Sequence, residues 1–159
     1  VSASLMAYQH DINLFRSEIG TFGRLIGLDP GTKTIGIAVS DGLRSIASPR
    51  ETIKRTKFSK DCQRLLAIIT EEEASGIVIG YPKNMDGSEG PRCQSVRQFA
   101  TNIAKEITIP ILLWDERLST SAVERTMLDA DLSRKRRSEL VDKLAASYIL
   151  QGSIDGLKG

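Results

Sequence analysis

Residues 24–40, RLIGLDPGTKTIGIAVS, decide the fold of this chain. Residues 24–29 form a short apolar run that ends in an acid, Asp29. Pro30, Gly31 and Thr32 then supply turn chemistry, and residues 35–40 alternate bulky with small side chains at the period of two that is typical of a strand. The stretch therefore predicts a β-hairpin whose first strand ends in a carboxylate.

The rest of the chain alternates helical and strand patterns around this hairpin. A meander followed by strand–helix alternation predicts an α/β fold, a mixed β-sheet with helices on both faces. A capping box, Ser121 to Glu124, predicts a helix that runs to about Asp129. The other expected elements are a strand within 46–53, strands at 76–81 and 109–114, and helices at 58–74, 92–106 and 138–153.

The length of 159 residues fits one domain. We expect an N-terminal arm at residues 1–23, loosely attached and with one short helix, an ordered domain at 24–154, and a tail at 155–159. Met6 is a possible native start, which would make residues 1–5 an extension. No apolar run approaches the ~20 residues that span a bilayer, and the first twenty residues lack the pattern of a signal peptide. We therefore expect a cytoplasmic protein with no membrane contact.

The composition restricts the chemistry. Cys62 and Cys93 are far apart and form no C-x-x-C pair, which disfavours a zinc site and favours a reducing compartment. The single histidine, His10, lies in the N-terminal arm and is a poor basis for a Ser-His-Asp mechanism. A metal would therefore need oxygen ligands, which favours Mg²⁺ or Mn²⁺.

Acidic residues at three places are candidates for such ligands. Asp29 follows one apolar strand, Asp115 and Glu116 follow another, and Asp142 lies on the inner face of the last predicted helix. Only one of the adjacent pair can face a given site, and we favour Glu116, with Asp115 as a substitute or an outer partner. Each acid also has a plain structural explanation, as a turn former, a loop residue or an exposed acid in a first helical turn. Together they could hold two divalent ions about 4 Å apart.

Basic and polar residues near these acids are candidates for phosphate contacts. The glycine-containing loop at 82–91 carries donors suited to phosphate oxygens, and two basic runs, at 54–60 and 134–137, are either solvated or in contact with phosphate. The net charge of +2 alone does not indicate nucleic-acid binding. The predicted nucleic-acid contacts are Lys83, Asn84, Arg92, Arg117, Arg134, Lys135, Arg136 and Arg137.

Four motifs in order, between about residues 24 and 151, resemble the YqgF family of pre-16S rRNA nucleases, also described as Holliday junction resolvases. They are Gly27-Leu28-Asp29-Pro30-Gly31, Gly80-Tyr81-Pro82-Lys83 with Asp86-Gly87-Ser88, Asp115-Glu116-Arg117-Leu118-Ser119-Thr120, and Val141-Asp142-Lys143-Leu144-Ala145-Ala146. The resemblance implies a ribonuclease H-like fold, a bacterial cytoplasmic protein, and a role in maturing the 5′ end of 16S rRNA. It also implies that Asp29, Glu116 and Asp142 are catalytic. The family usually has Gly-Leu-Pro where this chain has Gly80-Tyr81-Pro82.

Three other functions fit part of the sequence pattern. A resolvase of four-way DNA junctions would use the same chemistry but would need a dimer, and the sequence defines no oligomeric state. An ATPase of the actin and sugar-kinase kind opens with a similar hairpin but needs two such domains, and a P-loop is excluded because position 32 is Thr. A structured-RNA binding module without catalysis would gain nothing from three acids beside a phosphate site.

Overall fold

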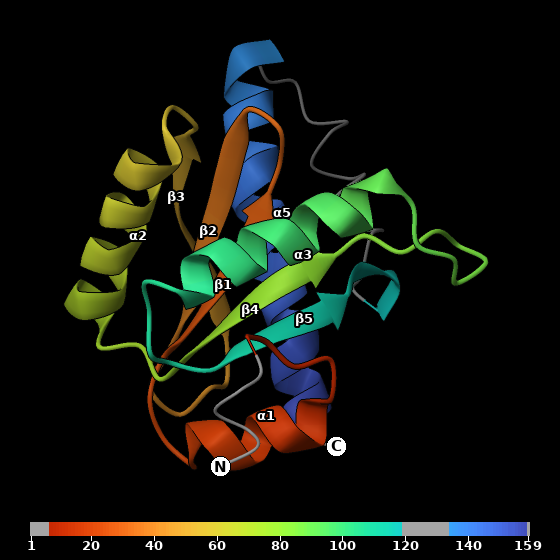
Figure 1. Ribbon diagram of the computed structural model, residues 1–159. Helices are drawn as coiled ribbons and strands as arrows, with labels where there is room; N and C mark the ends of the chain where they lie inside the picture. Colours follow the sequence, from red (N-terminus) through yellow and green to blue (C-terminus); the bar gives the residue numbers. More distant parts are fainter. Residues whose placement is uncertain (1–6, 119–133, 159) are drawn as a thin grey trace.

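The computed structural model describes residues 7–118 and 134–158, with the side chains of 7–117 and 143–158. Its centre is a five-stranded sheet of order β3-β2-β1-β4-β5 (Figure 1). The β1–β2 and β2–β3 pairs are antiparallel, whereas β1–β4 and β4–β5 are parallel, so the predicted mixed sheet and its hairpin are confirmed. The strands are β1 (Leu25–Pro30), β2 (Thr34–Ser40), β3 (Ala47–Lys54), β4 (Gly76–Tyr81) and β5 (Ile111–Asp115).

Helices cover both faces of the sheet, as predicted (Figure 1). Helices α2 (Phe58–Glu72) and α3 (Pro91–Ala104) pack on one face, and their buried residues join those of the strands in one core. Helix α5 (Arg134–Lys158) packs on the other face together with α1 (Ile12–Ile19) and forms a second core. Since side chains alternate along a strand, each strand contributes to both cores.

Helix α5 is longer than predicted at both ends. Residues 134–137, expected as a basic loop, form its first turn, because Arg and Lys are good helix formers. Residues 155–158, expected as part of a tail, form its last turn, which follows the fully buried Ile154 and in which the Leu157 carbonyl accepts a hydrogen bond from Arg16 at 3.0 Å. The helix predicted at 121–129 lies outside the described residues. In the part that the structure describes, no helix is both long and apolar enough to cross a membrane.

The segment before β1 contains the expected short helix but is not loosely attached. Phe15 is fully buried and Ile19 nearly so, because their spacing of four places both on the face of α1 that meets α5. Gln9 also pairs with the edge strand β5, since its N–H donates to the Ile111 carbonyl at 2.8 Å and its carbonyl accepts from the Leu113 N–H at 2.7 Å. The segment thus covers the edge of the sheet.

Helix α5 crosses the sheet closely at Gly27 of β1. A Cβ atom at this position would lie 2.7 Å from the Leu150 Cβ and 2.9 Å from the Ala146 carbonyl oxygen. Such distances exclude any side chain, so the glycine sets how near the helix comes to the strand. The carboxyl end of β1 consequently lies directly beneath α5.

Candidate active site

Asp29 emerges on the face of the sheet that α5 covers. Leu25, Gly27 and Asp29 alternate onto one face of β1, and Leu25 belongs to the core that contains the α5 residues. Asp29 pairs with Gly36 of β2 and is half-buried. The strand therefore delivers its carboxylate to the space between the sheet edge and α5.

Glu116 reaches the same face from the end of β5. It opens a short 3-10 turn, Glu116–Leu118, directly after the strand. Its carboxylate lies over Gly80 of β4, because a Cβ atom at Gly80 would stand 2.5 Å from the Glu116 Oε1. The missing side chain of Gly80 thus leaves the space that the carboxylate occupies.

The parallel register places Asp29 and Gly80 side by side. Leu28 of β1 is paired with Ile79 of β4, so the next residues along the two strands are Asp29 and Gly80. Neighbouring strands lie about 4.8 Å apart. The carboxylates of Asp29 and Glu116 therefore converge at the carboxyl edge of β1 and β4, the edge where open α/β sheets bind ligands.

Asp115 has a different environment. Its carboxylate accepts hydrogen bonds from Arg117, including one of 2.7 Å from a terminal guanidinium nitrogen. These hydrogen bonds lower the pKa of Asp115, against the opposing effect of burial. Arg117 also donates to the carbonyl of Met85 at 3.4 Å. Asp115 and Arg117 therefore join the end of β5 to the loop at 82–90, and the predicted phosphate contact of Arg117 competes with this ion pair.

The backbone of α5 brings Asp142 to the same end of the sheet. Gln151 accepts a hydrogen bond from the N–H of Ala47, at the start of β3, whereas Lys143 lines a cavity with Lys54, at its end. Lys54 pairs with Thr34, the first residue of β2, so the part of α5 around Lys143 lies near the turn that follows Asp29. Asp142 lies one helical turn before Ala146, and its side chain falls outside the described part.

The donor set fits a hard metal ion, although the described side chains alone do not complete a site. Among residues 7–117 and 143–158, no three His, Cys, Asp or Glu side chains lie together as a metal-binding group. The two carboxylates that do converge are both oxygen donors, and Gly80 provides a recess that one of them fills. Oxygen donors of this kind suit Mg²⁺ or Mn²⁺.

The loop at 82–90 is held by its own hydrogen bonds. The Asn84 amide donates to the Ser88 Oγ at 2.9 Å, and Asp86 accepts from the Ser88 N–H and Oγ. Gly87 has a φ of 88°, which favours glycine. Asn84, predicted to contact phosphate, thus uses a side-chain donor to shape the loop. Hydrogen bonds from Arg117 and from Tyr81 are the main causes that lower the pKa of Asp115 and of Glu89, and the nearby charge of Lys83 lowers both further.

A polar cluster beside this loop was not expected from the sequence. Tyr81 donates to Glu89, and Arg97 donates to the Tyr81 hydroxyl and to Glu89. His10 meets the Tyr81 ring edge-on with centroids 5.1 Å apart, and burial lowers the pKa of the imidazole. The cluster ties α3 and the N-terminal segment to the residue after Gly80. Tyr81 is also the position that departs from the family motif.

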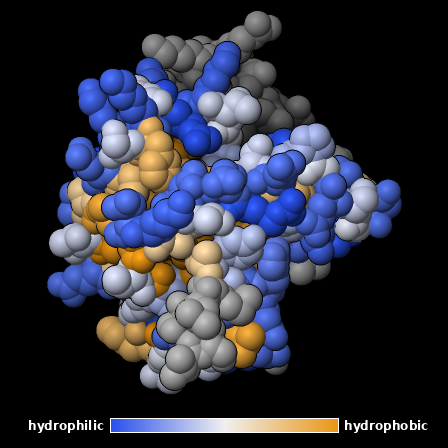
Figure 2. Space-filling view, in the orientation of Figure 1, coloured by the Kyte–Doolittle hydropathy of each residue, from blue (hydrophilic) through white to orange (hydrophobic). Residues whose placement is uncertain are grey.

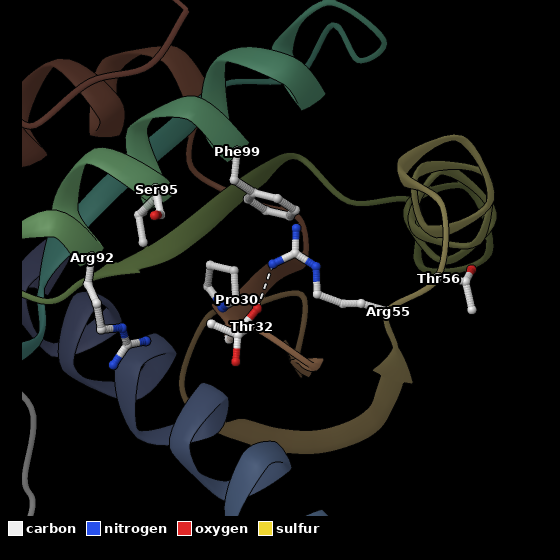
Figure 3. Close-up of a pocket in the computed structure, with 9 residues that line it drawn as sticks. Pro30, Thr32, Arg55, Thr56, Arg92, Ser95 and Phe99 are labelled. Atoms are coloured by element: carbon white, nitrogen blue, oxygen red, sulfur yellow. Dashed lines mark hydrogen bonds between the residues drawn. The ribbon is translucent and has the colours of Figure 1, made fainter.

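Arg92 lines a cavity of about 440 Å³ on the other side of the turn that follows Asp29 (Figure 3). In this view Arg92 of α3 and Arg55, from the segment after β3, approach Pro30 and Thr32 from opposite sides. Arg55 donates to the carbonyl of Gly31 at 2.5 Å, and its guanidinium carbon lies 5.4 Å from the centre of the Phe99 ring. Arg55 is thus part of a built surface beside the site.

Cys62 and Cys93 are both free and buried, and burial raises the pKa of the Cys62 thiol. The side chains of Arg134, Lys135, Arg136 and Arg137 lie outside the described part, so their predicted phosphate contacts stay predictions.

A mixed sheet of this order, with acids at the ends of its parallel strands, defines the ribonuclease H-like class. The structure is similar to that of Thermus thermophilus RuvC in complex with a Holliday junction substrate, with a TM-score of 0.54, 15% identity, and coverage of 86% of this chain and 96% of that one. A second Thermus thermophilus RuvC structure gives a TM-score of 0.51 at 16% identity, covering 86% and 96%. These likenesses confirm the predicted ribonuclease H-like fold.

The sequence identifies the family within that class. The model of the family described as "RuvX: Holliday junction resolvase" matches residues 23–156, and the chain belongs to this family, which is also called YqgF. A protein of Paramagnetospirillum magneticum is 60% identical over 86% of this chain and 88% of its own length, and one of Ruegeria pomeroyi is 56% identical over 91% and 94%. Both are named "Putative pre-16S rRNA nuclease".

Proposed function

We propose that this chain is a divalent-metal-dependent nuclease of the cytoplasm that hydrolyses phosphodiester bonds in 5′-end processing of pre-16S rRNA. The observation that carries the proposal is the Glu116 carboxylate seated over Gly80, beside Asp29. The names of the 60% and 56% identical relatives support the substrate. A module that only binds RNA would not need two carboxylates converging beside its phosphate contacts.

Asp29, Glu116 and Asp142 are the residues that would hold Mg²⁺ or Mn²⁺. When bound, such ions supply a hydroxide at neutral pH and stabilise the charge on the leaving oxygen. The chain itself orients the carboxylates. Asp29 is fixed by the β1–β2 ladder, and Glu116 is fixed by the recess at Gly80 and the turn that follows β5. Asp115 remains engaged with Arg117 and keeps the loop at 82–90 beside the site.

Cations around this edge would hold the substrate phosphates. Lys83 lies two residues after the end of β4, and Arg92 lines the cavity beside the turn after Asp29. Within the described part of the chain, Arg92 makes no ion pair that would compete with a phosphate. Neutralising Arg134, Lys135, Arg136 and Arg137 together should weaken binding and flatten its salt dependence. An unchanged salt slope would remove that turn of α5 from the interface.

A four-way DNA junction is the second candidate substrate, favoured by the description of the family. Junction resolution requires two symmetric incisions and therefore two active sites. A resolvase would cut both strands of a junction as a dimer, whereas an rRNA nuclease would trim a linear precursor. The two reactions are separable in one assay.

The test is a cleavage assay with Mn²⁺ on a 5′-extended 16S precursor RNA and on a four-way DNA junction. Asp29→Asn and Glu116→Gln should each reduce cleavage about a thousandfold, since metal-ion catalysis contributes several kcal/mol. Glu18→Gln, an exposed change on α1, is the matched control and should cut as the wild type does. Trimming of the RNA alone supports the proposal, and paired cuts in the junction alone favour the resolvase. Undiminished cleavage by both carboxylate variants would refute the assignment of Asp29 and Glu116 to the active site.

A further inference from the structure

A groove runs along α3 from the turn after Asp29 toward α2. It consists of two adjoining cavities, of about 440 and 490 Å³, which share Arg55, Ser95 and Phe99. The first reaches Pro30, Gly31 and Thr32, and the second continues along α3 to Asn102. Hydrophobic surface is visible between the hydrophilic side chains over α2 and those over α3 (Figure 2).

The lining of this α2–α3 groove has one sign of charge. Two arginines, Arg55 and Arg92, line it, and no described lining residue is acidic. Its charge therefore favours an anionic ligand. The remaining lining side chains include hydroxyls and amides that can donate and accept hydrogen bonds, among them Thr32, Thr56, Gln94, Ser95, Gln98 and Asn102.

The groove also presents flat surfaces. The Arg55 guanidinium is backed by the Phe99 ring, 5.4 Å from its centre, and is held in place by its hydrogen bond to the Gly31 carbonyl. Phe58 is 37% exposed, enough to offer its ring to a ligand. A guanidinium plane or an aromatic ring is the surface on which an unpaired base stacks.

These features match a single strand better than a duplex. A duplex keeps its base faces inside the stack and presents phosphates and groove edges, so it would use the arginines but not the flat surfaces or the amides. A single strand uses all three, since its phosphates meet arginines, its bases stack, and its base edges bond to amides.

We propose that the α2–α3 groove binds a single-stranded RNA segment that flanks the cleaved bond. The inference rests on the proposed nuclease function and deepens it, because it states which form of substrate the site receives. The strand would leave the carboxylates of Asp29 and Glu116 across the turn at 30–32 and continue along α3. Arg92 would hold a phosphate near the turn, and Arg55 would stack on a base.

The test is equilibrium binding of two RNA hairpins to the full chain carrying Asp29→Asn, which prevents cleavage. One hairpin is blunt, and the other carries a single-stranded extension of about ten nucleotides, within the span of known single-strand sites. The extension should raise the affinity about tenfold or more, since each stacked base contributes measurably. Equal affinities for the two hairpins would overturn the proposal.

Two matched substitutions, one inside the groove and one outside it, test whether the single-stranded extension binds in the groove. Gln98→Glu adds a carboxylate to the groove without changing size, and Gln63→Glu makes the same change on an exposed position of α2 that lines neither cavity. Gln98→Glu should lower the affinity of the extended hairpin about tenfold and that of the blunt one much less. Gln63→Glu should change neither appreciably. Equal effects of the two substitutions on the affinity would contradict binding of the extension in the α2–α3 groove.

The outcomes separate this inference from the proposed function. If the wild type cuts precursor RNA but the Asp29→Asn variant binds both hairpins alike, the single-strand groove is refuted and the nuclease function stands. A chain that prefers the extended hairpin but cuts no RNA would refute the nuclease and leave a single-strand binding groove.

Discussion

The Glu116 carboxylate occupies the place where a side chain at Gly80 would stand. The Cβ atom of an alanine there would lie 2.5 Å from the Glu116 Oε1 and 2.5 Å from the Ile149 Cδ1. Both distances are far below van der Waals contact, so the carboxylate, the helix or the strand would have to move. The glycine of β4 is therefore a positioning residue for the acid of β5.

Gly80→Ala should consequently reduce nuclease activity more than it reduces stability. Overpacking of this kind costs about 1–3 kcal/mol, which leaves most of the chain folded, whereas a displaced metal ligand should lower kcat about a hundredfold. Gly76→Ala is the matched control, since it lies on the same strand and face and its Cβ would meet Ile19 Cγ2 at 2.8 Å, away from the carboxylates. Thermal melts of both variants measure the loss of stability, and their cleavage rates measure the loss of activity. Equal activity losses at equal stability would contradict a positioning role for Gly80.

Binding of Mn²⁺ should stabilise the folded chain, and Asp29 should be required for this. A ligand that binds only the folded state at a hundredfold excess over its Kd adds about 2.7 kcal/mol. The wild type and Glu18→Gln should show the corresponding rise in Tm, and EDTA should reverse it. Asp29→Asn should show little rise. An equal rise in Asp29→Asn would place the ion elsewhere in the molecule.

The acids of the candidate site could be predicted because each directly follows an apolar strand. Parallel strands end at one edge of a sheet, so the sequence predicts that Asp29 and Glu116 lie close together. Alternation along β5 predicts only that one of Asp115 and Glu116 faces the site. In the structure the Glu116 carboxylate lies over Gly80, whereas the Asp115 carboxylate is paired with Arg117. The recess at Gly80 also has a sequence signal, since a glycine inside a strand pattern indicates that another group approaches the backbone closely.

Other features around the candidate site cannot be predicted from a local sequence pattern. The Tyr81–Glu89–Arg97 cluster and the stacking of Arg55 on Phe99 join residues far apart in sequence, so only the fold brings them together. The attachment of the N-terminal segment was missed for another reason. Phe15 and Ile19 have helical spacing, but one short helix gives too few repeats to indicate which face is buried.

The buried position of Phe15 predicts that the N-terminal segment is needed for stability. Phe15→Ala should cost about 3–5 kcal/mol, because it removes a fully buried ring from the core between α1 and α5. Leu14→Ala, on the exposed face of the same helix with 49% of the residue accessible, should cost about 0.5 kcal/mol or less. Urea unfolding measures both. A loosely attached arm would instead give two equally small losses.

The Asp115–Arg117 ion pair should contribute to the stability of the folded chain in a way that depends on pH. Arg117 holds the pKa of Asp115 below its usual value, so the carboxylate form stabilises the folded state. A group whose pKa is lowered on folding contributes in full above its unfolded pKa, about 3.9 for Asp, and loses the contribution as the pH falls through its folded pKa. The pair should therefore stabilise the chain at neutral pH and contribute little in strong acid.

Arg117→Met keeps the aliphatic stem and removes the charge, so it should lower the Tm by a few degrees at pH 7. The gap to the wild type should persist down to about pH 4 and close below it, as Asp115 takes up a proton. Arg92→Met removes a guanidinium that forms no ion pair in the described part of the chain, so its Tm gap should not depend on pH in this way. Melting curves between about pH 3 and 7 test this, within the range where Asp titrates. A gap for Arg117→Met that stays constant across this range would show that Arg117 stabilises the end of β5 through its contact with the Met85 carbonyl rather than through the charge of Asp115.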